Sequence, residues 1–467
     1  MGMPFRWRDT LRKGTVARMR CYNACVPDEH MSDEQLTKVA GAGAVRARPP
    51  EHARGLRRRW VYLLPVVFVT YSLAYLDRAN YGFGAAAGLA ETLKISNARS
   101  AFLGSLFFLG YFVFQIPLAD YAKRKSATLL VFLGLVGWGT TAALTGVIHV
   151  FWLLGLDRML LGVAESAVFP SMLILLTHWF TRAERSRANA ILILGNPVTV
   201  LWMSAVTGFL IKAVGWQMMF VVEGLPSVLW ALVWLLVARD RPRQARWMSA
   251  QCCDELMAEL EREQTTIPPR ANLWAAVRAP GVVLLSVQFF FWSIGVYGFV
   301  LWLPTMIRAG SSRGIGAVGL LSAVPFLLAV ILMLGVAHSA DKALNRKPYV
   351  APFLVVSGLA LFTSYATAGH SFWLAYAFLI VAGGAMYAPY GPFFSIIPEI
   401  LPSNVSGQVF ALINSCGALG GFVGTWLVGL LQAWTGGSRA GFLFMSLCLT
   451  VSGVMILLLR TAHRVKD

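Results

Sequence analysis

Apolar residues occur in long runs along this chain, and short polar segments separate the runs. Twelve runs are long enough to cross a lipid bilayer, which takes roughly 20 residues of α-helix. Backbone polar groups in lipid must be satisfied within the segment, so we predict a helix for each run. The predicted crossings are residues 60–87, 101–120, 128–148, 151–177, 188–213, 216–238, 281–307, 316–338, 349–369, 372–396, 404–432 and 440–460.

One polar break, at residues 239–278, is much longer than the others and divides the crossings into two groups of six. The expected fold is therefore an all-α membrane protein with twelve transmembrane helices in two six-helix bundles. Met31 offers an alternative start within the first segment. The predicted parts are a disordered basic cytosolic tail (1–57), the two bundles (58–238 and 279–461), a cytosolic linker with an amphipathic helix near 253–262 (239–278), and a cytosolic tail (462–467).

Composition excludes a soluble globular protein, because 57% of the residues are hydrophobic and only 13% are charged. A net charge of +18 could indicate nucleic acid binding, but the basic residues lie in short segments between apolar runs. The richest of these segments fall on one side of the predicted membrane, which is the cytosolic side by the positive-inside rule. We therefore expect an inner (plasma) membrane protein with both termini in the cytoplasm, surrounded by lipid and without a nucleic acid partner.

Two loops repeat one pattern at equivalent places in the two halves. Asp120 precedes the basic cluster 123–125, and Asp341 precedes the basic residues Arg346 and Lys347. This echo supports two parallel repeats of six helices. Each acid could meet a helix N-terminus or a nearby Arg and hold an inward gate closed, although ordinary basic loops explain each one equally well.

Four of the ionisable residues inside the predicted crossings of the first half are candidates for a functional site. Asp77 and Arg78 are adjacent in the first crossing, and Arg158 and Glu165 lie two helical turns apart in the fourth. A charge in the membrane costs roughly 2.5–3.5 kcal/mol on insertion scales, so charges that persist there mark ion pairs or transport pathways.

The chemistry of these four groups suits the transport of an anion with protons. Arg78 and Arg158 offer planar guanidinium groups that match a carboxylate ligand. Burial favours the neutral form of a carboxyl group, which suits Asp77 and Glu165 for proton exchange. The alternative is that the four residues only form ion pairs that hold two helices together.

Other polar and irregular positions carry weaker signals. Pro389 and Pro392 should interrupt the tenth crossing. The glycines of 417–424 have the spacing of close helix packing. Side chains that could line a cavity, or else form hydrogen bonds between helices, are Tyr111, Gln115, Asn189, Asn196, Trp292, Tyr297, Tyr387, Tyr390 and Asn414.

The sequence offers no pattern of a catalytic or metal centre. The six cysteines have no CxxC spacing, and no clustered histidines accompany them. We expect no enzyme activity, no cofactor, no metal and a monomeric protein.

Five segments together resemble the anion:cation symporter family of the major facilitator superfamily. They are YLDRANYGF at 75–83, GYFVFQIP at 110–117, RMLLGVAES at 158–166, GWQMMFVVEG at 215–224 and ALINSCGALGGFVG at 411–424. The resemblance implies that Asp77 and Glu165 handle protons and that Arg78 binds a substrate carboxylate. It also implies that Arg158, Tyr111, Asn196 and Asn414 belong to the site. Three residues depart from the family pattern: Gln115, Thr128 and Phe394.

The resemblance implies import of an organic acid anion by proton symport with alternating access. Segments 386–394 and 192–199 look most like permeases for 2-ketogluconate and related sugar acids such as aldonates. Phe394 leaves room for an aromatic acid, so uptake of an aromatic or dicarboxylic acid is the main alternative. Export of drugs in exchange for protons and a membrane sensor are further alternatives.

Overall fold

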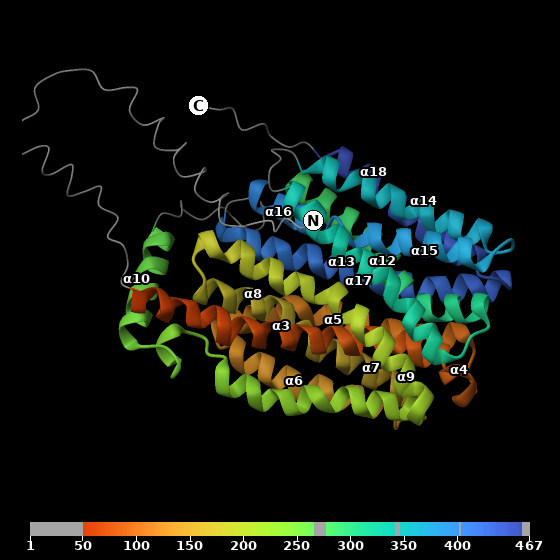
Figure 1. Cartoon of the computed structure of the whole chain (residues 1–467), viewed down its shortest axis with the longest axis horizontal. Coiled ribbons are helices and arrows are strands. Elements are labelled where there is room, and N and C mark those ends of the chain that lie inside the picture. Colours follow the sequence, from red (N-terminus) through yellow and green to blue (C-terminus); the bar gives the residue numbers. More distant parts are fainter. Residues whose placement is uncertain (1–49, 266–276, 341–345, 401–402, 460–467) are drawn as a thin grey trace, which may run out of the picture. The chain divides into compact units, whose positions relative to one another are not determined.

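A computed structural model describes residues 50–265, 277–340, 346–400 and 403–459. Within these ranges the chain is helical, with no strand, and Figure 1 shows the long helices lying side by side. The residues from Arg54 onward form one unit, to which the following description applies. The predicted gating residue Asp341 and the predicted cytosolic tail (462–467) lie outside the described residues.

The described part before the long polar break contains seven helices. They are α3 (Pro50–Ala86), α4 (Leu89–Thr92), α5 (Asn97–Arg124), α6 (Ala127–Thr145), α7 (Phe151–Ser166), α8 (Val168–Trp179) and α9 (Arg182–Val237). The described part of the break contains η1 (Pro242–Gln244) and α10 (Ala250–Thr265). After the break follow α12 (Pro280–Ser311), α13 (Ile315–Ala340), η2 (Lys347–Tyr349), α14 (Ala351–Thr367), α15 (Phe372–Tyr387), α16 (Tyr390–Ile400), α17 (Ser403–Thr435) and α18 (Arg439–Leu457).

Eleven candidate membrane spans are present among the described residues, and one of them contains two crossings. Helix α9 is 56 residues long and is broken at Gly215, where φ is 83° and ψ is 167°. Only glycine adopts this backbone conformation without strain, so the chain reverses there without a longer loop. The two parts of α9 are the predicted fifth and sixth crossings, and the predicted number of twelve is confirmed.

The fourth and tenth crossings are both interrupted near their middle. α7 ends at Ser166 and α8 begins at Val168, while α15 ends at Tyr387 and α16 begins at Tyr390. Proline lacks the backbone N–H that continues a helix; Pro170 lies in the first turn of α8, and Pro389 lies within the break between α15 and α16. The predicted interruption of the tenth crossing is confirmed, and the interruption of the fourth is an additional finding.

Glycines allow the helices of each half to approach closely. A Cβ atom at Gly162 of α7 would lie 1.9 Å from the carbonyl oxygen of Phe107 on α5. A Cβ atom at Gly424 of α17 would lie 2.4 Å from the carbonyl oxygen of Ile294 on α12. The glycine spacing at 417–424 therefore produces helix packing, as the sequence predicts. Contacts between the halves run mainly from α9 to α13 and from α5 to α17.

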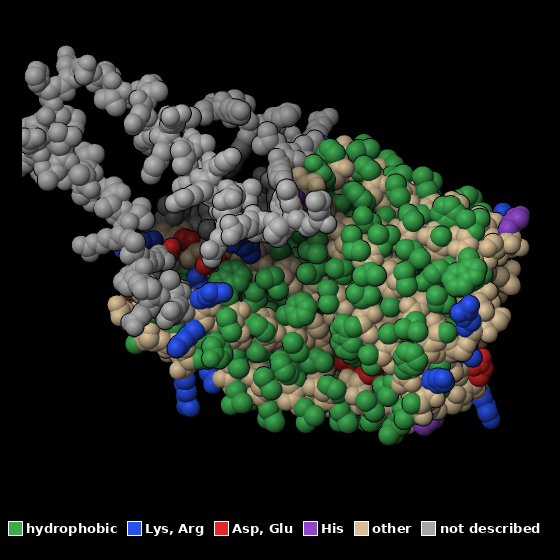
Figure 2. All heavy atoms as spheres, viewed as in Figure 1, with side chains coloured by type: hydrophobic (Ala, Val, Ile, Leu, Met, Phe, Trp, Pro, Cys, Tyr) green, Lys and Arg blue, Asp and Glu red, His purple; other side chains and the backbone are tan. Residues whose placement is uncertain are grey.

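The outer surface of the helices is apolar. Trp152 and Leu236 are each 76% exposed, and Leu229 is 66% exposed. Figure 2 shows hydrophobic side chains across the face in view, with Lys and Arg side chains toward the two ends of the helices. An exposed apolar area of this extent needs a lipid environment.

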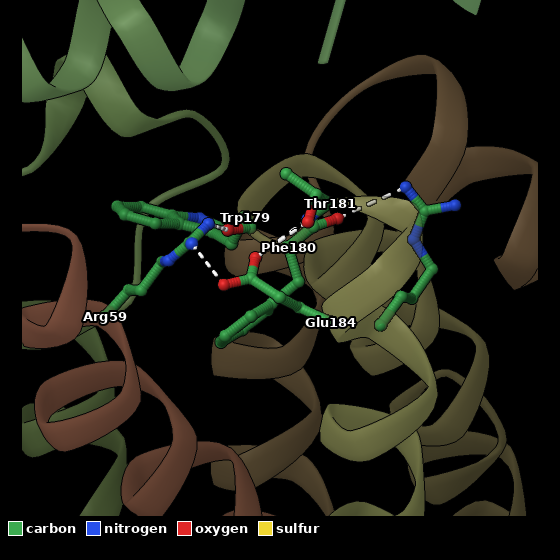
Figure 3. Close-up of polar contacts among 6 residues, drawn as sticks. Arg59, Trp179, Phe180, Thr181 and Glu184 are labelled. Carbon is green, nitrogen blue, oxygen red and sulfur yellow. Dashed lines mark hydrogen bonds and ion pairs between the residues drawn. The ribbon is translucent and has the colours of Figure 1, made fainter. Parts of the chain in front are cut away.

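A network of polar contacts joins helix ends on the side where α10 lies. Arg59 of α3 donates to the carbonyl oxygen of Trp179 and pairs with Glu184 of α9, both at 2.7 Å (Figure 3). Glu184 also accepts hydrogen bonds from the backbone N–H and the hydroxyl of Thr181, which fixes the first turn of α9. On the same side, Asp240 accepts hydrogen bonds from Ser126 and Thr128 and so binds the start of α6.

Candidate functional site

A buried ion pair joins the first and fourth crossings. Nη2 of Arg78 on α3 lies 3.0 Å from Oε2 of Glu165 on α7, and the two side chains are 8% and 0% exposed. The sequence indicates that both residues lie within the membrane, and the structure brings these two together rather than Arg78 with its neighbour Asp77. At this burial the pair is strongly attractive, and removal of either partner would leave a charge without compensation.

Aromatic rings surround the guanidinium group of Arg78. It lies 4.8 Å from the ring centre of Tyr111 and 5.2 Å from those of Tyr75 and Phe107. Its Nη1 is 3.5 Å from the hydroxyl oxygen of Tyr297 on α12, a long contact that reaches the second half. Ring faces stabilise a cation without neutralising it, so Arg78 remains able to bind an anion.

Asp77 faces a different set of groups from Arg78. It is fully buried, and the amide nitrogen of Asn80 lies 3.4 Å from its Oδ1. The same amide nitrogen lies 3.2 Å from Oε2 of Glu223, on the second part of α9. Thr207 donates to the other oxygen of Glu223 at 2.5 Å. Asp77 and Glu223 form no ion pair within the part of the chain that the structure describes.

Arg158 is buried without an ion pair among the described residues. It is 1% exposed, and its guanidinium group lies 4.8 Å from the ring centre of Tyr81. Its Nε and Nη1 atoms have no hydrogen-bond partner among these residues. The preceding residue, Asp157, accepts a hydrogen bond of 2.8 Å from Thr145 of α6. Arg158 thus has donor capacity that a bound anion could use.

The second half contributes an aromatic cluster, formed by Phe289, Trp292, Tyr387, Tyr390 and Phe393. The Tyr390 ring lies 4.5 Å from that of Trp292 and stacks on that of Tyr387 at 5.6 Å. The Trp292 indole donates to the carbonyl oxygen of Met386, which fixes the end of α15. The hydroxyl of Tyr387 lies 3.2 Å from that of Tyr75, so this cluster meets the first half beside Arg78.

A small cavity lies between the two halves at this place. Its lining includes Arg78, Tyr75 and Tyr81 from α3, and Tyr297 and Leu301 from α12. Both halves therefore contribute to the space next to the Arg78–Glu165 pair.

The remaining predicted residues lie in several environments. Tyr111 contacts Arg78, and Asn196 of α9 is 9% exposed with an Oδ1 that has no described partner. Asn414 is partly buried on α17. Gln115 of α5 is fully buried, and neither of its amide atoms has a described partner.

Of the two predicted gating residues, the structure describes Asp120. Asp120 pairs at 2.8 Å with Arg124 on its own helix, and both side chains are more than half exposed. Asp341 lies outside the described residues, so the gating role of both stays a prediction.

Sequence reasoning assigned no role to Glu223, Asn80 or Tyr75, although all three lie within the quoted segments. The signal that could have identified Glu223 is that it is the one ionisable residue in the predicted crossing 216–238. No group of three metal-binding side chains occurs within the described ranges.

Comparison with known proteins identifies the group to which this arrangement belongs. The profile of the Major Facilitator Superfamily matches residues 67–425. The chain belongs to the Major Facilitator Superfamily. This membership confirms the predicted superfamily and fold class, and the chain is a multi-pass membrane transporter rather than a member of an enzyme family.

Relatives of this chain within the Major Facilitator Superfamily are named for different substrates. A quinolone resistance transporter of Acinetobacter baumannii is 30% identical, covering 82% of this chain and 90% of the relative. A putative tartrate transporter of Agrobacterium vitis is 29% identical, covering 88% and 95%. A D-galactonate transporter of Escherichia coli O6:H1 is 25% identical, covering 89% and 99%.

A solved structure supports the same superfamily fold. The crystal structure of a bacterial homologue of the human lysosomal transporter Spinster, inward-facing and occupied, aligns with a TM-score of 0.67. It covers 87% of this chain and 97% of that chain at 17% sequence identity, so the likeness concerns the fold alone.

Proposed function

We propose that this transporter imports an organic acid anion by proton symport with alternating access. The observation that carries the proposal is the buried Arg78–Glu165 ion pair beside a cavity to which both halves contribute. A guanidinium group that is held by a carboxylate can exchange that partner for the carboxylate of a substrate.

Protonation of Glu165 is the event that couples proton binding to substrate binding. A neutral Glu165 no longer compensates the charge of Arg78, and a substrate carboxylate then takes its place. The same site binds substrate poorly when Glu165 is ionised, since two carboxylates would compete for one guanidinium. Asp77, buried without an ion-pair partner among the described residues, is the second proton-coupling group of the proposal.

The substrate that these residues suit best is a hydroxylated carboxylate. Arg78 binds one substrate carboxylate. The hydroxyl groups of Tyr75, Tyr387 and Tyr390 can form hydrogen bonds with substrate hydroxyl groups. A sugar acid such as 2-ketogluconate or an aldonate is the first candidate, in line with the relative named as a D-galactonate transporter.

The unpaired Arg158 favours an alternative within the same class. It could hold a second carboxylate, and two relatives of Agrobacterium vitis are named as putative tartrate transporters. A dicarboxylic acid, or an aromatic acid against Phe393 and Phe394, is therefore the rival substrate. Asn196 and Asn414 are proposed as further contacts in either case.

We also propose the anion:cation symporter family and an inner-membrane location with cytosolic termini. The polar contacts of Arg59, Glu184 and Asp240 lie at one end of the helices, where Lys123 and Arg124 complete α5. This concentration of basic residues supports a cytosolic position for that end.

Export in exchange for protons is a second candidate function. The observation in its favour is the relative named as a quinolone resistance transporter, at 30% identity. Symport and exchange respond oppositely to a pH gradient: a symporter concentrates its substrate when the outer solution is the more acidic, and an antiporter when the interior is.

Uptake into proteoliposomes with an imposed pH gradient tests the proposal. Radiolabelled 2-ketogluconate, D-galactonate, tartrate and norfloxacin serve as probes, with a protonophore as the control for coupling. We expect one of the three acids to accumulate only when the exterior is acidic. Accumulation of norfloxacin alone, and only into acidic vesicles, would establish export instead.

Two substitutions test the proton-coupling residues in the same vesicles. Asp77→Asn and Glu165→Gln should abolish accumulation while leaving counterflow exchange partly intact, since neither amide can release a proton. Glu91→Gln, at an exposed carboxylate outside the site, is the matched control. If Asp77→Asn concentrates the acid as well as the parent does, the coupling assignment is wrong.

A further inference from the structure

The interior of the first half contains more acidic than basic groups. Buried carboxyl groups are those of Asp77, Asp157, Glu165 and Glu223, and the guanidinium groups among them are those of Arg78 and Arg158. Arg59 is also buried, but it pairs with Glu184 at the end of the helices. With every group ionised, this interior would hold two uncompensated negative charges, which is costly without water.

Two of these carboxyl groups have a cation nearby that stabilises the ionised form. Glu165 pairs with Arg78, and Asp157 accepts a hydrogen bond from Thr145 and interacts with the neighbouring Arg158. Asp77 and Glu223 are left, and in the described part of the chain neither has a salt-bridge partner within 4.0 Å. We call Asp77 and Glu223 the carboxyl pair.

One amide group connects the carboxyl pair. The Asn80 nitrogen lies 3.4 Å from an oxygen of Asp77 and 3.2 Å from an oxygen of Glu223, and its two hydrogens allow it to donate to both. Two carboxylates that share one donor repel each other when both are ionised, so at least one of them keeps a proton. Thr207 completes the surroundings of Glu223 from its own helix.

The groups that face the carboxyl pair come from three helices. α3 supplies Asn80, and α9 supplies Thr207 beside Glu223 and Ser227 beside Asp77. α7 supplies Arg158 and Glu165, which act electrostatically on Asp77. The only cation in this set acts on Asp77, while Glu223 meets neutral donors. Glu223 is therefore the member of the pair that is better suited to hold a proton at rest.

We propose that Glu223 is an additional proton carrier beside Glu165 and Asp77, linked to Asp77 through the amide group of Asn80. This inference rests on the proposed proton symport, which it deepens. A proton leaves a carboxyl oxygen of Glu223, and the resulting carboxylate is held by Thr207 and Asn80. Its charge opposes ionisation of Asp77, so the two groups load and release protons in a coupled way.

The slope of substrate accumulation against the imposed pH gradient tests this inference. Radiolabelled D-galactonate or tartrate is added outside the proteoliposomes, and the ratio of internal to external substrate is measured over a series of gradients. We expect Glu223→Gln to lower the number of protons per substrate by about one while it retains counterflow exchange in part. Glu91→Gln should keep the parental slope. An unchanged slope in Glu223→Gln would overturn the proposal.

Infrared difference spectra provide a reading that needs no substrate. A pH jump on the purified transporter should produce a carbonyl band of protonated carboxyl groups that is weaker in Glu223→Gln. Should that variant fail to fold, Thr207→Val should instead shift the pH at which the band is half lost. A band that neither variant alters would contradict the inference.

The two measurements also separate this inference from the proposed function. Failure of the parent to accumulate any acid under a pH gradient would remove the symport proposal, and the infrared band would still decide whether Glu223 holds a proton. If the parent takes up an acid in a pH-coupled way, and Glu223→Gln has the same slope and the same infrared band as the parent, the further inference is wrong and the symport proposal stands.

Discussion

The two halves share one helical plan but have different interiors. In the first half, buried acidic and basic side chains extend from Asp77 to Glu223 through the helices that line the site. In the second half, no Asp, Glu, Lys or Arg is buried among the residues whose burial the structure describes, and the aromatic cluster occupies the corresponding region. Both halves break one crossing near its middle, at Ala167 and at Ala388.

This difference suggests a division of labour between the halves. Charged groups in the first half can change protonation and exchange partners, whereas rings and hydroxyl groups in the second half can shape the space beside them and hydrogen-bond to a substrate. We therefore expect substitutions in the first half to alter coupling and substitutions in the second half to alter selectivity.

The largest effect is expected from Arg78→Ala. It removes the anion anchor and leaves the buried Glu165 unpaired, which costs about 3–5 kcal/mol when a buried pair is broken. Accumulation and counterflow exchange should both be lost in proteoliposomes, unlike in Asp77→Asn. Arg78→Lys restores the charge without the planar fork and should recover only part of the exchange. Counterflow exchange at the parental rate in Arg78→Ala would show that Arg78 does not bind the substrate.

Helix packing gives the next effect, and it should be similar in the two halves. A methyl group at Gly162 would overlap the carbonyl oxygen of Phe107, and one at Gly424 would overlap that of Ile294. Overpacking of this kind typically costs about 1–3 kcal/mol. Gly162→Ala and Gly424→Ala should each lower the unfolding temperature in detergent, followed by tryptophan fluorescence. Gly335→Ala, with nothing within 4 Å of the added atom, should not.

Tyr387→Phe should produce a smaller effect, confined to selectivity. It removes the hydroxyl that faces Tyr75, a contact worth about 0.5–1.5 kcal/mol, and leaves the ring stacked on Tyr390. Competition among the three acids should change by roughly 2- to 10-fold, while the slope against the pH gradient stays parental. A changed slope with unchanged competition would reverse the proposed division of labour.

Asp120→Asn should have the smallest effect on stability. Its pair with Arg124 is exposed and lies within one helix, so it contributes about 0.3–0.5 kcal/mol. The unfolding temperature should remain close to that of the parent. A large loss of transport rate without a loss of stability would instead support the predicted gating role of Asp120.

Much of the helical plan could be predicted because it depends on local sequence. Apolar runs of sufficient length give the crossings, Pro389 gives the break in the tenth, and the glycine spacing at 417–424 gives close packing. The break in the fourth crossing was missed, although Pro170 is a similar local signal.

The sequence predicted which residues belong to the candidate site but not which of them contact one another. Asp77 and Arg78 are neighbours in the sequence, yet successive side chains of a helix point about 100° apart. Arg78 therefore pairs with Glu165. Asp77 contacts Asn80, whose amide group lies between Asp77 and Glu223.

The sequence by itself determined that this chain spans a membrane many times and carries charges where lipid excludes them, because chain length and transfer free energy are properties of short segments. Only the tertiary structure decided which charges compensate one another. Coulomb attraction depends on the distance between groups on different helices, and the packing of α3, α7 and α9 sets that distance.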